Sequence, residues 1–315
     1  MRKKTKILLI TAMIIAISLL TSQLLQAPST SQPNDSQLQS ALDDEPSKED
    51  LEEVIEEAQA ENEEPENQIT EEIRKTVKQV VESALGIFLK NDLRIVAIGD
   101  SLTQGVGDTT DNGGYVGILK NTFKDNDQSI HIDNYGKRGN RSDQLLKRLE
   151  NPEIISSIEK SDIVLVTIGA NDIMKVVKDN FTDIKYDQFV EEQSNYSDRL
   201  TKIFDTIIDI NPDASIFLIG FYNPFEKYFG DIEQLGLILD NWNTAGNTIS
   251  SEYDQIQFIP IIDLFRDTEE NLFSDDNFHP NIKGYQLIAE RVFKHIRPSI
   301  ERIEEDNTSN EQVEE

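Results

Sequence analysis

The sequence predicts an α/β domain in which a parallel β-sheet lies between two layers of helices. Short apolar runs recur along the chain from Leu93 onward, and longer amphipathic segments separate them. Strands that are apolar throughout are buried on both faces of a sheet, and helical connections make neighbouring strands parallel. The stretch from Leu93 to about Arg297 has the length of one such domain.

Five apolar runs are expected to form the strands, at residues 94–98, 130–135, 163–168, 216–220 and 257–262. Segments with helical periodicity lie at residues 115–123, 142–149, 189–210, 235–253 and 282–296. Five such units indicate a flavodoxin-like three-layer α/β/α sandwich with the strand order 2-1-3-4-5. In sheets of this kind the functional site lies beyond the carboxyl ends of the strands.

Residues 1–26 are expected to be a signal peptide or an N-terminal membrane anchor. Arg2-Lys3-Lys4-Thr5-Lys6 precedes an almost wholly apolar run, and no charged residue follows until Asp35. A basic flank before an apolar stretch keeps its own end in the cytoplasm and places the rest of the chain outside. The match of Leu25-Gln26-Ala27 to a cleavage pattern is weak, which favours an anchor over a cleaved signal.

Residues 27–68 are expected to be a disordered acidic linker, because they are rich in polar and acidic residues and contain no aromatic residue. Apolar residues at helical spacing then predict an amphipathic helix within residues 69–92, which either docks on the domain or forms its stalk. The folded domain is expected at residues 93–298. The polar and acidic residues 299–315 are expected to be a frayed tail.

The composition excludes several kinds of function. The chain contains no cysteine, which excludes disulfides and thiol chemistry. A net charge of −29 argues against nucleic acid or an anionic membrane surface as the partner. We expect a structural role for His131 in a strand and an exposed His295 on the last helix. Neither adjoins a second His or Cys at ligand spacing, so no metal site is predicted.

Ser101 and His279 are the candidates for nucleophilic acyl transfer. Ser101 lies in Gly99-Asp100-Ser101-Leu102, directly after the first apolar run, and His279 lies in Asp276-x-x-His279-Pro280, before the last helix. A hydroxyl is a poor nucleophile until a base within hydrogen-bond reach can take its proton. The alternatives are structural, with Ser101 as a helix N-cap and His279 as a surface capping residue.

Two further polar segments follow the second and third apolar runs. They are Gly136-Lys137-Arg138-Gly139 and Gly169-Ala170-Asn171-Asp172. Because parallel strands end at one edge of a sheet, we expect these segments to converge with those that carry the serine and the histidine.

Together the four segments resemble the motif blocks of the GDSL/SGNH hydrolase superfamily, in the family's order and across most of the domain. The bacterial lipase/acylhydrolase branch is the most similar. The resemblance implies the SGNH hydrolase fold, with Ser101 as nucleophile, His279 as general base and Asp276 as the carboxylate that orients the base. It also implies an oxyanion hole formed by the Ser101 backbone N–H, Gly139 and Asn171.

Gly139 and Asn171 each have a structural alternative. Gly139 could be a turn glycine, and Asn171 could be an asparagine in a local turn. Asp100 and Asp172 are expected to orient loops rather than to take part in bond breaking. Asp275 ranks behind Asp276, because its spacing from the histidine is one residue off the family pattern.

Residues 108–114 after the serine turn, and residues 221–225 and 242–243 after the fourth run, are candidates to line the substrate pocket. The foremost of them are Tyr222, Asn223, Trp242 and Asn243. The rings of Tyr222 and Trp242 suit contact with an acyl chain or with the face of a sugar. A structural role for these residues, in core packing and loop anchoring, is an equal alternative to a role in the pocket.

The resulting hypothesis is a serine ester hydrolase of the cell envelope that needs neither a metal ion nor an organic cofactor. A lipase or lysophospholipase-type acylhydrolase is the first interpretation, and an O-acetyl esterase acting on wall or surface polysaccharide is the second. A non-catalytic envelope-binding scaffold module is the alternative outside the enzyme class. The catalytic domain is expected outside the cell membrane, where it is anchored by the N-terminal segment or, after cleavage, secreted.

Overall fold

The computed structural model describes residues 93–314 except residues 111, 126–129, 181, 225–232, 267 and 269. The predicted N-terminal segment, acidic linker and amphipathic helix, at residues 1–26, 27–68 and 69–92, therefore lie outside the described residues. Within the described part of the chain, no helix combines the length and the hydropathy that a membrane span requires.

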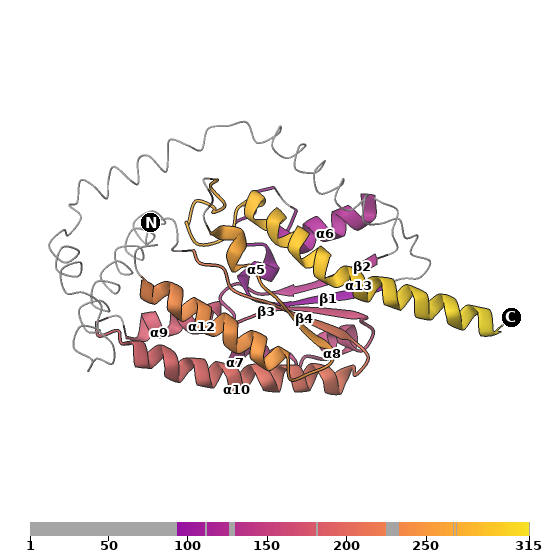
Figure 1. The fold of residues 1–315 in the computed structure, drawn as a ribbon, viewed down its shortest axis with the longest axis horizontal. Helices are drawn as coiled ribbons and strands as arrows, with labels where there is room; N and C mark the ends of the chain where they lie inside the picture. Colours follow the sequence, from indigo (N-terminus) through magenta and orange to yellow (C-terminus); the bar gives the residue numbers. More distant parts are fainter. Residues whose placement is uncertain are drawn as a thin grey trace.

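A parallel sheet of five strands forms the middle layer, in the predicted order β2-β1-β3-β4-β5 (Figure 1). The strands are β1 (Leu93–Gly99), β2 (Ile130–Gly136), β3 (Ile163–Thr167), β4 (Ser215–Ile219) and β5 (Ile256–Ile259). Strands β1, β3 and β4 are almost continuously buried, as expected for strands that are covered on both faces. The fold class and the strand order predicted from the sequence are confirmed.

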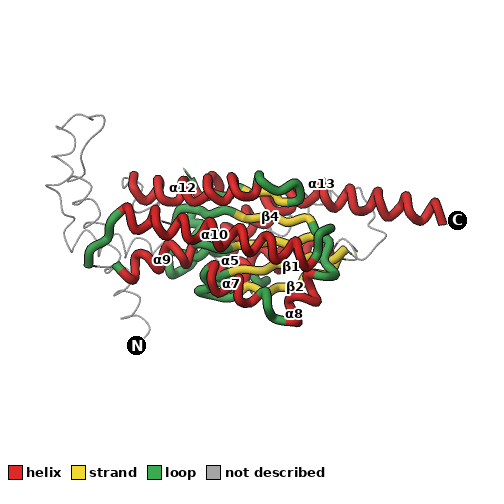
Figure 2. The backbone as a smooth tube through the Cα atoms, turned by 90° about the horizontal axis from the view of Figure 1, so that it is seen from below, coloured by secondary structure: helices red, strands yellow, loops and turns green. Residues whose placement is uncertain are grey.

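Helices cover both faces of the sheet (Figures 1 and 2). One layer contains α6 (Gly114–Asp125) and α13 (Ile282–Glu314). The other contains α7 (Ser142–Arg148), α8 (Pro152–Ile158), α9 (Ala170–Asp179), α10 (Tyr186–Ile210) and α12 (Glu233–Ser250). Two short helices lie at the sheet edge, α5 (Ser101–Gln104) after β1 and the 3-10 turn η1 (Ile262–Phe265) after β5.

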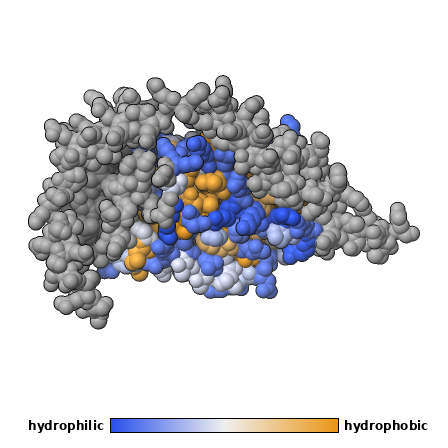
Figure 3. Space-filling view, turned by 45° about the horizontal axis from the view of Figure 1, so that its top comes forward, coloured by the Kyte–Doolittle hydropathy of each residue, from blue (hydrophilic) through white to orange (hydrophobic). Residues whose placement is uncertain are grey.

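The alternation of side chains along the strands produces two hydrophobic cores. In β1, Val96 and Ile98 pack in the core beneath α7 to α12, whereas Ile95 and Ala97 pack in the core beneath α6 and α13. On the face drawn in Figure 3, the described surface is mostly hydrophilic, with hydrophobic areas between. Among the described residues, Val190 and Leu237 are the large hydrophobic side chains that are well exposed.

The last helix is longer than the sequence predicts. It continues from Ile282 to Glu314, through the segment predicted to be a frayed tail from residue 299. Ser299 and Ile300 are buried, because Ile296, Ile300 and Ile303 continue the apolar face that packs on the sheet. The predicted domain boundary at residue 298 is therefore too early; Pro298 and the polar residues around Ile300 make the helical periodicity hard to recognise in the sequence.

Candidate active site

A tight turn at the end of β1 presents Ser101 at the carboxyl edge of the sheet. Gly99 has φ +157°, and a Cβ at that position would lie 2.1 Å from the backbone oxygen of Thr167. Asp100, rather than Ser101, is the N-cap of α5, and its Oδ1 accepts the backbone N–H of Leu102 at 3.0 Å. The structural alternative for Ser101, a capping serine, is thus wrong, and its hydroxyl is free for another partner.

That partner is His279, whose Nε2 lies 3.0 Å from the Ser101 Oγ. On the other side of the ring, Nδ1 lies 2.7 Å from Oδ2 of Asp276. His279 is buried, so the alternative of a surface capping residue is wrong as well. The structure therefore brings the three residues predicted as a triad into one hydrogen-bonded chain.

The second oxygen of Asp276 fixes the loop that carries the histidine. Its Oδ1 accepts the backbone N–H groups of Phe278 and His279, at 3.1 and 2.9 Å, and the Ser274 hydroxyl at 2.9 Å. Burial alone would raise the pKa of Asp276, but the hydrogen bonds from the ring and backbone of His279 outweigh it and hold that pKa well below its usual range. Asp276 is therefore ionised. The neighbouring Asp275 is exposed, as its lower rank predicts.

Gly107 lets the loop of the histidine approach the loop that follows α5. It has φ +102°, and a Cβ there would lie 2.9 Å from the Cβ of His279 and 2.5 Å from the backbone oxygen of Pro280. Only glycine combines this backbone conformation with so close a contact.

A buried polar cluster lies behind the serine. Thr167 Oγ1 donates to Oδ1 of Asp100 at 3.1 Å and lies 2.7 Å from the hydroxyl oxygen of Thr103, which in turn lies 2.9 Å from the hydroxyl oxygen of Tyr115. Burial raises the pKa of Asp100 to about 6, against the hydrogen bonds from Leu102 and Thr167. The cluster orients the turn, as expected for Asp100. The polar Thr167 within the third apolar run is the sequence signal that could have revealed this cluster.

The loop after β2, which carries Gly139, is joined to the turn that carries Ser101. The backbone N–H of Lys137 donates to the Gly99 oxygen at 3.0 Å, and that of Arg138 donates to Oε1 of Gln104 at 2.5 Å. Gly139 has φ +77°, and no atom lies within 4 Å of a Cβ built on it. In the described part of the chain, neither the Gly139 nor the Ser101 backbone N–H has a hydrogen-bond acceptor.

Asn171 lies in the first turn of α9 and is tied to the same loop. Its Nδ2 donates to the backbone oxygen of Asn140 at 3.0 Å, which leaves its second N–H available. Among the described residues, the structure thus holds N–H donors without acceptors at the positions predicted for the oxyanion hole.

Asp172 holds α7, α9 and α10 together, which agrees with its predicted orienting role. Its carboxylate accepts the backbone N–H of Ser142, at 3.0 Å to Oδ2, and the Ser142 hydroxyl, at 2.6 Å to Oδ1. Arg199 of α10 donates to Asp172, to Ser142 and to Glu192. Burial raises the pKa of Asp172, and the bonds from Ser142 and the charge of Arg199 oppose that rise. Sequence reasoning missed Ser142 and Arg199, whose partners are distant in the chain.

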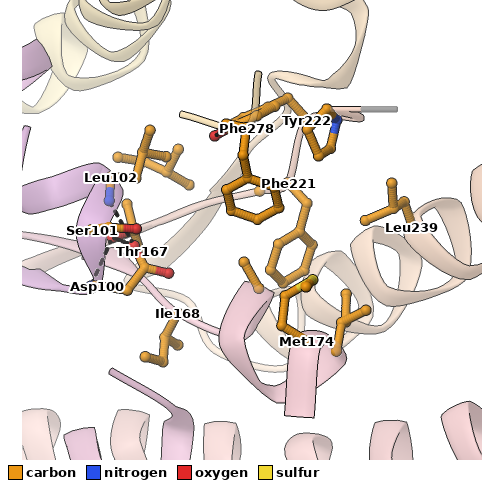
Figure 4. A pocket seen from close by; sticks show the side chains of 15 residues that line it. Asp100, Ser101, Leu102, Thr167, Ile168, Met174, Phe221, Tyr222, Leu239 and Phe278 are labelled. Carbon is orange, nitrogen blue, oxygen red and sulfur yellow. Dashed lines mark hydrogen bonds between the residues drawn. The ribbon is translucent and has the colours of Figure 1, made fainter. Parts of the chain in front are cut away.

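A pocket of about 590 Å³, including its open mouth, begins at Ser101 and extends between α9 and α12. Ser101 lies at one side of the pocket and Met174 and Leu239 lie at the far side, with the rings of Phe221 and Phe278 between them (Figure 4). The wall is mostly apolar and also includes Leu102, Ile168, Ala170, Ile173, Ile219, Gly220, Tyr222 and Pro224. Asp100 and Thr167 are its polar residues besides Ser101.

Of the four predicted pocket residues, the structure places Tyr222 in the wall and the other three elsewhere. Trp242 is a core residue, only 1% exposed, and stacks on Tyr196 with 4.8 Å between ring centroids. Asn243 supports the wall from behind, because its side chain accepts the backbone N–H of Phe221 and donates to the oxygen of the same residue. Asn223 is buried. The alternative of core packing and loop anchoring is correct for Trp242 and Asn243.

The other two histidines lie away from this site. His131 is exposed on the edge strand β2, with Nε2 2.9 Å from Asp133. His295, expected to be exposed, is half-buried, and its Nδ1 donates to the backbone oxygen of Arg291 at 2.8 Å. Within the described ranges, no group of three or more His, Cys, Asp or Glu side chains is arranged to hold a metal ion.

Known proteins resemble this chain in sequence. The model of the GDSL-like Lipase/Acylhydrolase family matches residues 97–287. The chain is 34% identical to YpmR of Bacillus subtilis (strain 168) over 212 residues, which cover 66% of this chain and 83% of YpmR. It is 26% identical to the spore germination lipase LipC of Bacillus licheniformis over 208 residues, which cover 64% of this chain and 94% of LipC.

Solved structures share the fold. The crystal structure of the lipase Lip_vut3 from a goat rumen metagenome has a TM-score of 0.57 at 24% identity, and the match covers 64% of this chain and 95% of that one. A mutant of the acetyl-xylooligosaccharide esterase Axe2 from Geobacillus has a TM-score of 0.51 at 20% identity, with 67% and 96% covered.

Proposed function

The chain belongs to the GDSL-like lipase/acylhydrolase family and is an ester-bond hydrolase, and we propose that it cleaves carboxylic esters through Ser101, His279 and Asp276. The observation that carries the proposal is the hydrogen-bonded chain of the three side chains at the mouth of an apolar pocket. Ionised Asp276 accepts the Nδ1 proton of His279, which leaves the Nε2 lone pair directed at the Ser101 hydroxyl.

The reaction proceeds in two steps. The Ser101 oxygen bonds to the ester carbonyl carbon while its proton passes to Nε2, and the carbonyl electron pair moves onto the oxygen. Collapse of this intermediate expels the alcohol, which takes the proton from His279, and an acyl-enzyme remains. Water then attacks the acyl carbon, gives a proton to His279, and the acid departs as Ser101 regains its proton.

The negative charge that develops on the carbonyl oxygen needs donors that are already in place. The backbone N–H groups of Ser101 and Gly139 and the free N–H of Asn171 are suited to that role, because they have no acceptors among the described residues. Each such donor contributes roughly 3–4 kcal/mol to transition-state stabilisation in comparable sites.

The shape and chemistry of the pocket favour an acyl chain longer than acetyl. The pocket extends from Ser101 past Phe221 to Met174 and Leu239, and an acetyl group would leave this apolar wall in water. The likeness to the spore germination lipase LipC supports a lipid ester as the substrate. We therefore place a lipase or lysophospholipase-type activity ahead of an O-acetyl esterase.

The deciding experiment uses p-nitrophenyl esters from acetate to palmitate with the full chain and with S101A and H279A. We expect hydrolysis that rises with chain length beyond acetate in the native protein and is lost in both variants, with unchanged circular dichroism. Turnover retained in both variants would refute the mechanism, and a preference confined to acetate would replace the lipase with an acetyl esterase. A fluorophosphonate probe that fails to label folded protein at Ser101 would revive the scaffold alternative.

A location in the cell envelope is part of the same proposal. It is supported by the basic residues and the apolar run at the N-terminus, which the sequence places within residues 1–26. Protease added to intact cells should degrade the domain if it lies outside the membrane. Protection until the cells are lysed would contradict that location.

A further inference from the structure

Arg148, in the last turn of α7, holds together three segments that meet beside the nucleophile. Its Nη1 donates to the backbone oxygen of Gly99 at 3.3 Å and to Oδ1 of Asn140 at 3.0 Å. Its Nη2 donates to the backbone oxygen of Tyr135 at 2.6 Å. One half-buried guanidinium thus ties the end of β1, the end of β2 and the loop after β2 to one point.

Two of the three acceptors, on Gly99 and Asn140, lie within two residues of a donor of the oxyanion hole. Gly99 precedes Asp100 and the nucleophile in the tight turn, so its position sets that of the Ser101 N–H. Asn140 directly follows Gly139 in the loop after β2. The backbone oxygen of Asn140 also accepts Nδ2 of Asn171 at 3.0 Å. The three donors come from three separate segments, and Arg148 contacts two of them directly and the third through Asn140.

The charge of Arg148 is not used in an ion pair within the described part of the chain, where no carboxylate lies within ion-pair distance of it. Its contacts are with two carbonyl oxygens and one amide oxygen. A guanidinium is suited to this task, because its rigid planar fork directs several N–H groups at fixed angles, whereas a lysine ammonium is a single point on a flexible stem.

From these contacts we propose that Arg148 is a positioning residue, which sets the spacing of the three N–H groups that bind the oxyanion. The inference rests on the proposed function and adds to it a residue outside the four motif segments. Donors that are displaced by a fraction of an ångström stabilise the transition state less, while the substrate, held mainly by the apolar pocket, binds as before.

The test compares R148M and R148K with R291M in the full chain. Arg291 is the matched control, because it also fixes a helix to a distant loop, through the backbone oxygen of Pro260 at 2.7 Å and the carboxylate of Asp263, but lies outside the candidate site. We expect R148M to lower kcat by roughly 10- to 100-fold with KM within about twofold of the native value. R148K should recover little of this loss, and R291M should keep the native kcat.

A second readout separates positioning from general destabilisation. A dialkyl p-nitrophenyl phosphate places its phosphoryl oxygen where the oxyanion forms, so R148M should be inactivated more slowly than R291M at equal folded fraction. The double variant R148M/N171A should lose less than the product of the two single losses, because both changes disturb one set of donors. If R148M unfolds at the assay temperature, the same kinetic and inactivation measurements are made with R148K, which keeps the length and the charge of the side chain.

Native kcat in folded R148M or R148K, an equal loss in R291M, or fully independent losses in the double variant would each overturn the positioning role. These outcomes can be told apart from a failure of the proposed function. If the proposed function is wrong, the native protein does not hydrolyse esters or S101A stays active, and this result does not depend on the Arg148 variants.

Discussion

Asp276 contacts His279 at two points, with Oδ2 2.7 Å from the ring Nδ1 and Oδ1 2.9 Å from the backbone N. One carboxylate therefore holds both the ring and the chain that carries it. The same geometry fixes the rotation of the ring towards Ser101, whose Oγ lies 3.0 Å from Nε2 although the two residues are 178 positions apart in the chain.

The first prediction concerns D276N. The amide can still accept the backbone N–H groups through its oxygen, but its NH₂ would face Nδ1 and favour the ring tautomer that cannot take the serine proton. We expect kcat to fall by roughly 10³- to 10⁴-fold while folding is retained. D275N removes the neighbouring exposed charge and is the control, with activity close to native in a p-nitrophenyl ester assay. Equal activity of the two variants would remove Asp276 from the triad.

The second prediction concerns N171A. Loss of the side-chain donor should lower kcat by roughly 10²- to 10³-fold with little change in KM, because the ground-state carbonyl needs the donor less than the oxyanion does. N180A is the matched control at the other end of α9, where Nδ2 donates to the Val176 oxygen at 2.9 Å. Steady-state kinetics of the two variants decide the matter, and an effect on KM alone would exclude the oxyanion role.

The third prediction concerns the far side of the pocket. M174W fills the space between α9 and α12 and should reduce hydrolysis of the octanoyl ester roughly tenfold or more, while hydrolysis of the acetyl ester is retained. V190W adds the same ring at an exposed position of α10, 47% exposed in the native protein, and should leave the chain-length profile unchanged. A profile that M174W does not alter would mean that acyl chains bind elsewhere.

The fourth prediction is a dependence of stability on pH. Burial raises the pKa of Asp100 from 3.8 to about 6, so the folded state holds this proton more tightly than the unfolded chain does. Stability therefore falls as pH rises through the window from 3.8 to about 6, by roughly 3 kcal/mol for this group.

D100N has no such proton to lose. Its free energy of unfolding, relative to that of the native protein, should rise across the same window by the same amount. Urea denaturation of both proteins at several pH values measures the difference. Parallel pH profiles for the two proteins would show that Asp100 keeps an ordinary pKa in the folded state.

The sheet and the meeting of the four motif segments could be predicted from the sequence, because both depend on local patterns. Buried parallel strands are marked by continuous apolar runs, and the polar residues that end each run must gather at one edge. Ser101, Asp276 and His279 are predictable for the same reason, since chemistry at that edge needs these residue types.

Most of the pocket wall and the supporting contacts could not be predicted in this way, although Tyr222 was. Trp242 is on a helix near the predicted site, and only its stacking on Tyr196, in another helix, reveals that it is a core residue. Arg148 stands beside the exposed Lys147 and has no local feature that distinguishes it. Two of its three acceptors are backbone oxygens, which every residue possesses, so no sequence pattern marks the contacts.

The proposed nucleophile follows the first strand of the described domain, whereas the proposed base and its carboxylate precede the last helix. A polypeptide that is still being synthesised therefore carries its serine long before it carries the group that activates it. In the proposed mechanism, ester cleavage can begin only after almost the whole domain has left the ribosome, so a growing chain should stay inert towards the esters of the cell that makes it.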